Sequence, residues 1–193
     1  MSAPPEELEV GVRAWAIPDY LRYRNPRGSG RQYVDLGPSD WTLIFDTETT
    51  VDESQRLRVG AYQIRRGHVL KGRGFFYEPG ELTGAELQLL HAHAGRLGSR
   101  VMTREQFMET VFFLVAWSLR GVMVGHNLPF DISRLAIGHA PAKSRDGSMR
   151  GGFTFQLSKD ERWPRIQVKP ISAKAAFIRF AVPKGRHPEQ RNP

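Results

Sequence analysis

The apolar side chains between residues 41 and 77 recur at the period of β-strands. Residues 41–45 are apolar at almost every position, which predicts a central strand that is covered on both faces. Residues 57–64 and 69–77 form two further extended stretches, joined by a tight turn. The pattern therefore predicts that the folded part of the chain opens with three consecutive strands.

After these three predicted strands, the apolar residues recur at the period of α-helices. Helices are expected at 83–97 and 103–120, because each opens on a threonine that can cap it, the second within a T-x-x-Q capping box. A short buried strand at 122–124 and a further helix at about 129–139 complete an α/β pattern. The second helix carries an apolar stripe that we expect to pack in the core: Phe107, Val111, Phe112, Val115 and Leu119.

The two ends of the chain differ from this central core at 41–140. Residues 1–40 contain many prolines and glycines and predict a basic N-terminal arm, whose arginines and tyrosines either grip nucleic acid or pack on the domain. Residues 141–193 predict a basic loop at 142–152, a β-hairpin extension with extended segments at 153–157, 165–169 and 175–182, and a frayed tail at 183–193. Within this extension Arg165 and Lys169 share one face of a strand, so we expect that face to be exposed and basic.

Charge and composition narrow the classes of function. The net charge is +8, and from Pro141 onward there are 12 Lys and Arg against 4 Asp and Glu, so the whole excess lies in the extension. This asymmetry favours nucleic acid as a partner, with a solvated basic tail as the alternative. The absence of cysteine excludes disulfides and thiolate zinc sites. With no secretory leader and no apolar run near the ~20 residues of a membrane span, we expect a cytoplasmic protein.

Two acidic residues stand at the end of the first predicted strand. Asp46 and Glu48 are two positions apart, so the pleat places both carboxylates on one face of the strand. Neighbouring carboxylates beside an apolar strand are normally tolerated when a cation lies between them, and hard divalent ions prefer oxygen ligands. A strand end that is simply exposed to solvent is the alternative.

A third acid begins the last predicted helix of the core. Asp131 lies in the first turn, after Pro129, and Asn127 stands one turn earlier. Asn127 can cap the helix or hydrogen-bond a substrate. Asp131 can either join the acid pair or only complement the helix dipole.

Together, these two segments resemble the first two motifs of the DEDD superfamily of 3′-5′ exonucleases, which includes proofreading domains of DNA polymerases. Asp46 and Glu48 match the family's D-x-E motif, and Asn127 with Asp131 matches its N-x-x-x-D motif. The resemblance implies an α/β fold with a ribonuclease-H-like mixed sheet flanked by helices. It also implies that Asp46, Glu48 and Asp131 are catalytic carboxylates that hold two Mg²⁺ or Mn²⁺ ions.

The resemblance further implies a reaction and a substrate. The reaction is hydrolysis of phosphodiester bonds from a single-stranded 3′ end of DNA or RNA, with release of 5′-mononucleotides, as in proofreading or DNA repair. Thr47 and Asn127 would contact the terminal nucleotide. We expect His126 and the basic residues Arg165 and Lys169 to add further substrate contacts.

The sequence departs from the family after Asp131. The third motif, H-x-x-x-x-D or Y-x-x-x-D, does not occur there. We therefore expect an incomplete site: either the sequence is a fragment whose missing segment carries the third motif, or a polymerase or another chain completes the site, or the site is degenerate. We expect weak or absent turnover from this chain alone, because such groups contribute roughly 10²–10⁴-fold each. The alternatives are a nucleic-acid-binding module on the same fold and an endonuclease with a different completing acid.

Overall fold

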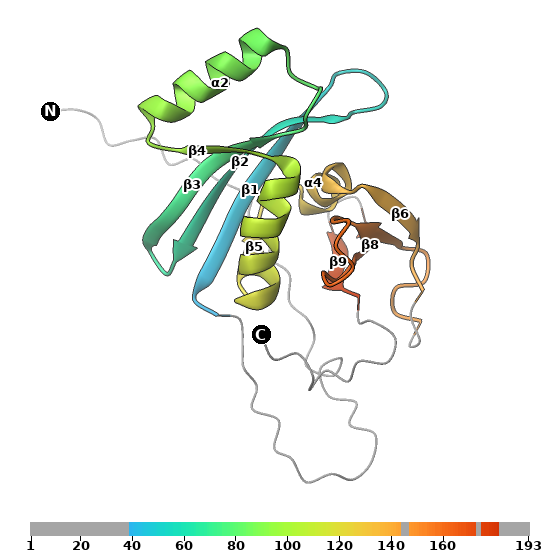
Figure 1. Cartoon of the computed structure of the whole chain (residues 1–193). Helices are drawn as coiled ribbons and strands as arrows, with labels where there is room; N and C mark the ends of the chain where they lie inside the picture. Colours follow the sequence, from blue (N-terminus) through green and yellow to red (C-terminus); the bar gives the residue numbers. More distant parts are fainter. Residues whose placement is uncertain (1–38, 144–146, 173–174, 182–193) are drawn as a thin grey trace, which may run out of the picture.

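The computed structural model describes residues 39–143, 147–172 and 175–181 (Figure 1). Almost all of the predicted basic arm and the whole of the predicted frayed tail lie outside the described residues. The described chain forms two β-sheets with helices, so the expected α/β class is confirmed. None of the helices in these ranges has the length and apolar character that crossing a bilayer would need.

The first sheet contains five strands: β1 (Trp41–Thr49), β2 (Leu57–Arg66), β3 (Val69–Tyr77), β4 (Arg100–Thr103) and β5 (Val122–Val124). Their order is β4-β3-β2-β1-β5. The first three strands form an antiparallel meander, whereas β5 runs parallel to β1 and β4 runs parallel to β3. Gly67 turns the chain between β2 and β3 at φ 52°, in the left-handed region that favours glycine. The predicted meander and mixed sheet are confirmed, while β4 was not predicted.

The two helices before β5 begin where the capping signals predict. α2 (Gly84–Arg96) and α3 (Arg104–Phe107) each start with a complete capping box, at Thr83 and Thr103. α3 continues directly into η1 (Met108–Ser118), which is a π-helix rather than the α-helix that the period suggested. Of the predicted apolar stripe, all members are buried except Leu119, which is half-buried.

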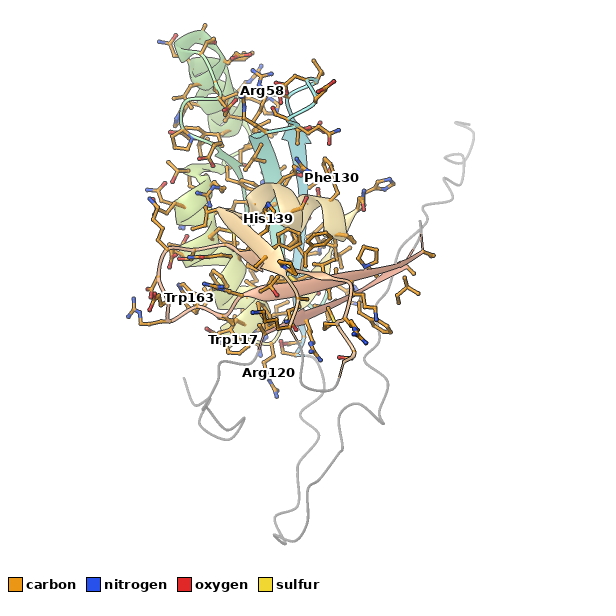
Figure 2. All side chains as sticks on the ribbon, turned by 90° about the vertical axis from the view of Figure 1, so that its right-hand side faces the viewer. Arg58, Trp117, Arg120, Phe130, His139 and Trp163 are labelled. Carbon is orange, nitrogen blue, oxygen red and sulfur yellow. The ribbon has the colours of Figure 1, made fainter. Side chains whose placement is uncertain are left out.

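One hydrophobic core joins the first sheet to the C-terminal part of the chain. Phe107 stacks on Phe76 of β3 with ring centroids 4.0 Å apart. Farther along η1, Phe113 stacks on Trp163 at 4.7 Å and Trp117 meets Phe180 edge-on at 4.9 Å, on the side that Figure 2 shows. Because η1 packs against apolar side chains on both sides, its sequence is apolar over most of its circumference.

The C-terminal part forms a second sheet rather than a simple hairpin. α4 (Leu128–Leu135) ends four residues earlier than predicted, and the chain enters an antiparallel sheet in the order β6-β7-β8-β9. Figure 1 shows this sheet on the β5 side of the first one. Its strands are β6 (Gly138–Pro141), β7 (Phe153–Gln156), β8 (Ile166–Ser172) and β9 (Ala175–Phe180).

β1 differs from its prediction in one respect that matters for the site. Leu43 and Phe45 are buried, but Ile44 is only half-buried and lines an open groove. The continuous apolar run predicted cover on both faces, and within the described ranges only the face toward η1 is fully covered.

Candidate active site

The acid pair at the end of β1 has the orientation that the strand pleat predicts. Asp46 and Glu48 are exposed, whereas the intervening Thr47 is buried on the same face as Phe45. β1 therefore presents two carboxylates on one face and a hydroxyl on the other.

The first turn of α4 packs directly against this strand end. A side chain at Gly125 would come within 2.9 Å of the backbone oxygen of Phe45, so glycine permits the close approach. Leu128 and Ile132 bury the inner face of α4. This packing brings Asp131, only 2% exposed, to Thr47, whose Oγ1 donates a 2.7 Å hydrogen bond to Asp131 Oδ1.

The second oxygen of Asp131 is unusual. Oδ2 is buried and has no hydrogen-bond partner among the described residues. Burial raises the pKa of Asp131 from 3.8 to about 6, the hydrogen bond from Thr47 opposes that rise, and the charge of Asp46 adds to it. Asp46 and Asp131 therefore lie close enough for the charge of one to affect the pKa of the other.

The three predicted carboxylates do not form one metal-binding site in this structure. Among the described residues, no three acidic or histidine side chains are grouped closely enough to hold one metal ion together. The physical reason is the strand alternation: Thr47, the neighbour of Asp131, points away from the face that carries Asp46 and Glu48. Mg²⁺ needs only one or two carboxylates besides water and substrate oxygens, so the orphaned Asp131 oxygen and the nearby Asp46 still suit such an ion.

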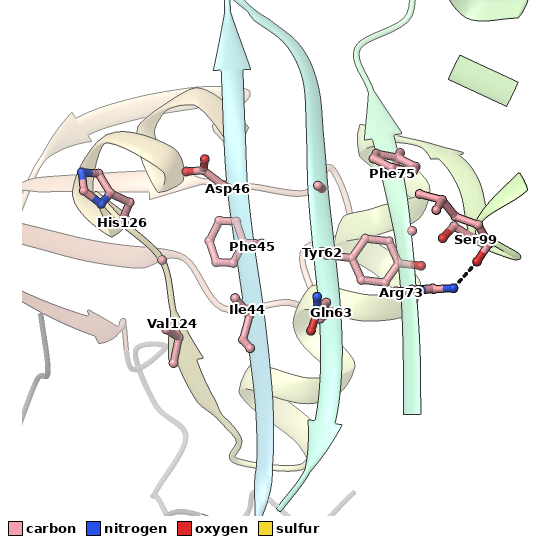
Figure 3. Close-up of a pocket in the computed structure, with 14 residues that line it drawn as sticks. Ile44, Phe45, Asp46, Tyr62, Gln63, Arg73, Phe75, Ser99, Val124 and His126 are labelled. Atoms are coloured by element: carbon pink, nitrogen blue, oxygen red, sulfur yellow. Dashed lines mark hydrogen bonds between the residues drawn. The ribbon is translucent and has the colours of Figure 1, made fainter. Parts of the chain in front are cut away.

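A groove of about 470 Å³, lined by Asp46 but not by Glu48, lies on the open face of the first sheet (Figure 3). Asp46 and His126 both line it, and Asp46 points from β1 toward the segment that carries His126. Ile44, Phe75 and Val124 supply an apolar floor. A flat apolar floor next to a carboxylate can hold a sugar or a base while its phosphate lies at the acids.

The remaining predicted contacts fall in two places. Asn127 and His126 are exposed just before α4, and the Asn127 side chain caps no N–H group of α4 in the described structure. The Asn127 side chain therefore does not take the capping role that the sequence offered as one alternative. Arg165 and Lys169 stand on the second sheet and do not belong to the groove lining.

Sequence reasoning missed one residue that fixes the geometry. Arg134 of α4 donates hydrogen bonds to the backbone oxygens of Ser54 and Gln55, at 3.2 and 3.0 Å, and stacks over Phe130 at 4.7 Å. It thereby ties the loop that follows Glu48 to the helix that carries Asp131. An arginine in the last turn of a helix looks like a dipole partner in the sequence, and only the fold reveals this second role.

The later aspartate that the structure describes does not complete the site. Asp160 lies between β7 and β8, and Arg162 pairs with it at 2.6 Å and lowers its pKa. It lines a separate pocket with Ser158 and Trp163. Asp146 lies outside the described residues.

Comparison of the chain with protein-family models, with curated proteins and with solved structures gives no match.

Proposed function

We propose that this protein is a metal-dependent nuclease that hydrolyses phosphodiester bonds from the 3′ end of DNA or RNA and releases 5′-mononucleotides. The observation that carries the proposal is the buried, half-unsatisfied carboxylate of Asp131 next to Asp46 at the end of β1. An unpartnered carboxylate oxygen beside a second acid is costly unless a cation or proton meets it.

The order of the elements supports the proposal. The chain forms a three-stranded meander, helix α2, the edge strand β4, the helical segment α3–η1, strand β5 parallel to β1, and then α4 with an acid in its first turn. Apart from the added α2 and β4, this order is the one expected of a ribonuclease-H-like nuclease. The D-x-E pair stands at the end of β1, and Asp131 follows β5, the neighbour of β1. We therefore extend the proposal to a ribonuclease-H-like fold.

Each residue of the site has a role in this proposal. Asp46 and Asp131 hold divalent ions, Glu48 binds an ion or orients the attacking water, and Thr47 holds Asp131 in place. Bound Mg²⁺ or Mn²⁺ ions would supply Lewis-acid stabilisation of the phosphate and an activated water. Asn127 and His126 meet the terminal nucleotide, whose base or sugar lies in the groove of Figure 3.

A nucleic-acid-binding module without turnover is the second candidate. Two observations favour it: the described residues contain no group of three metal ligands, and the basic residues Arg165 and Lys169 lie apart from the acids. The same observations lead us to expect slow turnover from this chain alone.

The proposal is tested with Mn²⁺ and a 5′-labelled single strand, using the full chain. We expect stepwise shortening from the 3′ end, reduced by about 100-fold or more in Asp46→Asn and in Asp131→Asn. Asp40→Asn is the matched control, because Asp40 is exposed and paired with Arg66 near the other end of β1, so its activity should equal that of wild type. Cleavage of a circular strand would indicate an endonuclease, and activity that survives both site substitutions would refute the proposed site.

A further inference from the structure

The second sheet has two faces of opposite character. Ile166 and Val168 of β8 point inward and are buried in the common core. Residues 165, 167 and 169 point outward, because successive side chains of a strand alternate between its two faces. In the register of the sheet, Gln167 lies opposite Thr154 of β7 and Arg179 of β9, which places these three side chains in one outward row.

Hydrogen bonds fix this outward row. The Gln167 amide nitrogen lies 3.4 Å from the Thr154 hydroxyl and donates to the backbone oxygen of Lys143 at 3.0 Å. Arg179 Nε donates to Gln167 Oε1 at 3.0 Å. Gln167 is therefore buried, contrary to the prediction of a fully exposed strand face, because the backbone at Lys143 and the side chains of Thr154 and Arg179 cover it, and the part of the face that stays open lies toward Arg165 and Phe177. The amide holds the guanidinium of Arg179 in place on the outer face.

Cations dominate the rest of the outer face. Arg165 is exposed just before β8, and Lys169 of β8 is half-buried with its Nζ donating to the backbone oxygen of Ser148 at 2.9 Å. Strands β6 to β9 contain no Asp or Glu in their described residues. The described acids nearest along the chain, Asp160 and Glu161, lie in the loop before β8.

An exposed aromatic ring lies within this group of cations. Phe177 of β9 pairs in register with Lys169 and is 40% exposed, and Arg179 is two residues farther along the same face. At about 3.3 Å per residue, Arg165 and Lys169 are roughly 13 Å apart, the length of about four nucleotides stacked at roughly 3.4 Å. An exposed aromatic ring next to cations suits a polyanion whose units also contain planar rings, because the rings can stack while the cations contact the negative charges.

We propose that the outer face of the second sheet binds single-stranded nucleic acid, with Phe177 stacking on a base and Arg165 and Lys169 contacting phosphates. Base stacking on an aromatic ring combined with a basic track is the general means of holding single strands without reading their sequence. The choice of nucleic acid as ligand rests on the proposed nuclease function, which this surface deepens by specifying the form of the strand. Duplex offers no free base face, so we expect it to bind more weakly.

The test measures fluorescence anisotropy of a labelled 20-nucleotide single strand with the full chain in EDTA, over a series of salt concentrations. Phe177→Ala should weaken binding by about 5- to 100-fold with little change in salt dependence. Arg165→Glu should weaken binding and lower the slope of log affinity against log salt by about one or more. Phe177→Trp should retain the affinity of wild type, which separates loss of stacking from loss of folding.

Two controls are matched to these variants. Phe153→Ala removes a ring that is 46% exposed on the inward side of β7, and Lys71→Glu makes the same charge change on β3 of the first sheet. Both should bind as wild type does. Equal losses in Phe177→Ala and Phe153→Ala, or tighter binding of duplex than of single strand, would overturn the inference.

The proposed function and this inference fail independently. Because EDTA removes divalent ions, Asp46→Asn and Asp131→Asn should retain single-strand binding whether or not the chain is a nuclease. A wild type that binds the single strand but does not cleave it with Mn²⁺ would remove only the nuclease proposal, whereas a wild type that cleaves but does not bind in EDTA would remove only the proposed surface.

Discussion

Asp131→Asn is the substitution that most directly tests the burial of a carboxylate at this site. In the folded protein the pKa of Asp131 is raised from 3.8 to about 6, mainly by burial. The folded state therefore holds a proton that the unfolded chain releases, so the free energy of unfolding falls as pH rises from about 4 to about 6. Asparagine does not ionise, and the variant escapes this loss.

The size of the effect follows from the shift. Two pKa units correspond to at most about 3 kcal/mol, and relaxation and water penetration around a buried charge reduce this to about 1–2 kcal/mol. The amide of asparagine also places an unpaired N–H₂ group where Oδ2 lies, which costs on the order of 1 kcal/mol at every pH. We therefore compare the free energy of unfolding of the variant with that of the wild type at each pH, and follow how this difference changes with pH.

Urea unfolding of both proteins in EDTA at pH 4, 5, 6 and 7 measures this quantity. We expect the free energy of unfolding of the variant, relative to that of the wild type, to rise by about 1–2 kcal/mol between pH 4 and pH 7. Asp52→Asn is the opposite control, because hydrogen bonds from Thr50 and Ser54 lower the pKa of Asp52, so its difference should be flat or fall with rising pH. A flat or falling difference for Asp131→Asn would refute the reasoning.

Three further predictions concern the supports of the site. Thr47→Val removes the hydroxyl that donates to Asp131, so the pKa of Asp131, followed by carboxyl NMR, should rise above about 6, and an unchanged value would contradict the hydrogen bond. Gly125→Ala should lower the free energy of unfolding in urea by about 1–3 kcal/mol, because its Cβ would approach the Phe45 backbone oxygen within 2.9 Å; no loss would show that α4 can shift. Arg134→Ala should make the loop amides after Glu48 exchange hydrogen faster, because it removes the two hydrogen bonds from Nη1 to the backbone oxygens of Ser54 and Gln55; unchanged exchange would contradict this role of Arg134.

Much of the first sheet could be predicted from local signals. The meander followed from alternating extended runs and a glycine turn, and both capping boxes located their helix starts. The end of α4 was missed because the sequence after Leu135 keeps apolar residues, while its backbone continues into β6 and pairs with β7. Strands β7, β8 and β9 follow the extended segments that the sequence predicted, but β6 was taken as the end of a helix, so a hairpin was expected in place of a four-stranded sheet.

The candidate site was partly predictable for a similar reason. Strand alternation placed Asp46 and Glu48 on one face, and the helix-start signals placed Asp131 near a strand end. The sequence did not indicate that Thr47, rather than the acid pair, is the direct partner of Asp131. The close approach of α4 to β1 depends on tertiary packing at Gly125, which propensity does not report.

The central claim is that Asp46 and Asp131 share divalent cations. Calorimetric titration of Mn²⁺ into wild type, Asp46→Asn, Asp131→Asn and the Asp40→Asn control at pH 7.5 tests it most directly. We predict saturable binding to wild type and to Asp40→Asn, and binding weakened by about 10-fold or more in both site variants. Binding that is the same in all four proteins, or that is absent from wild type, would contradict the claim.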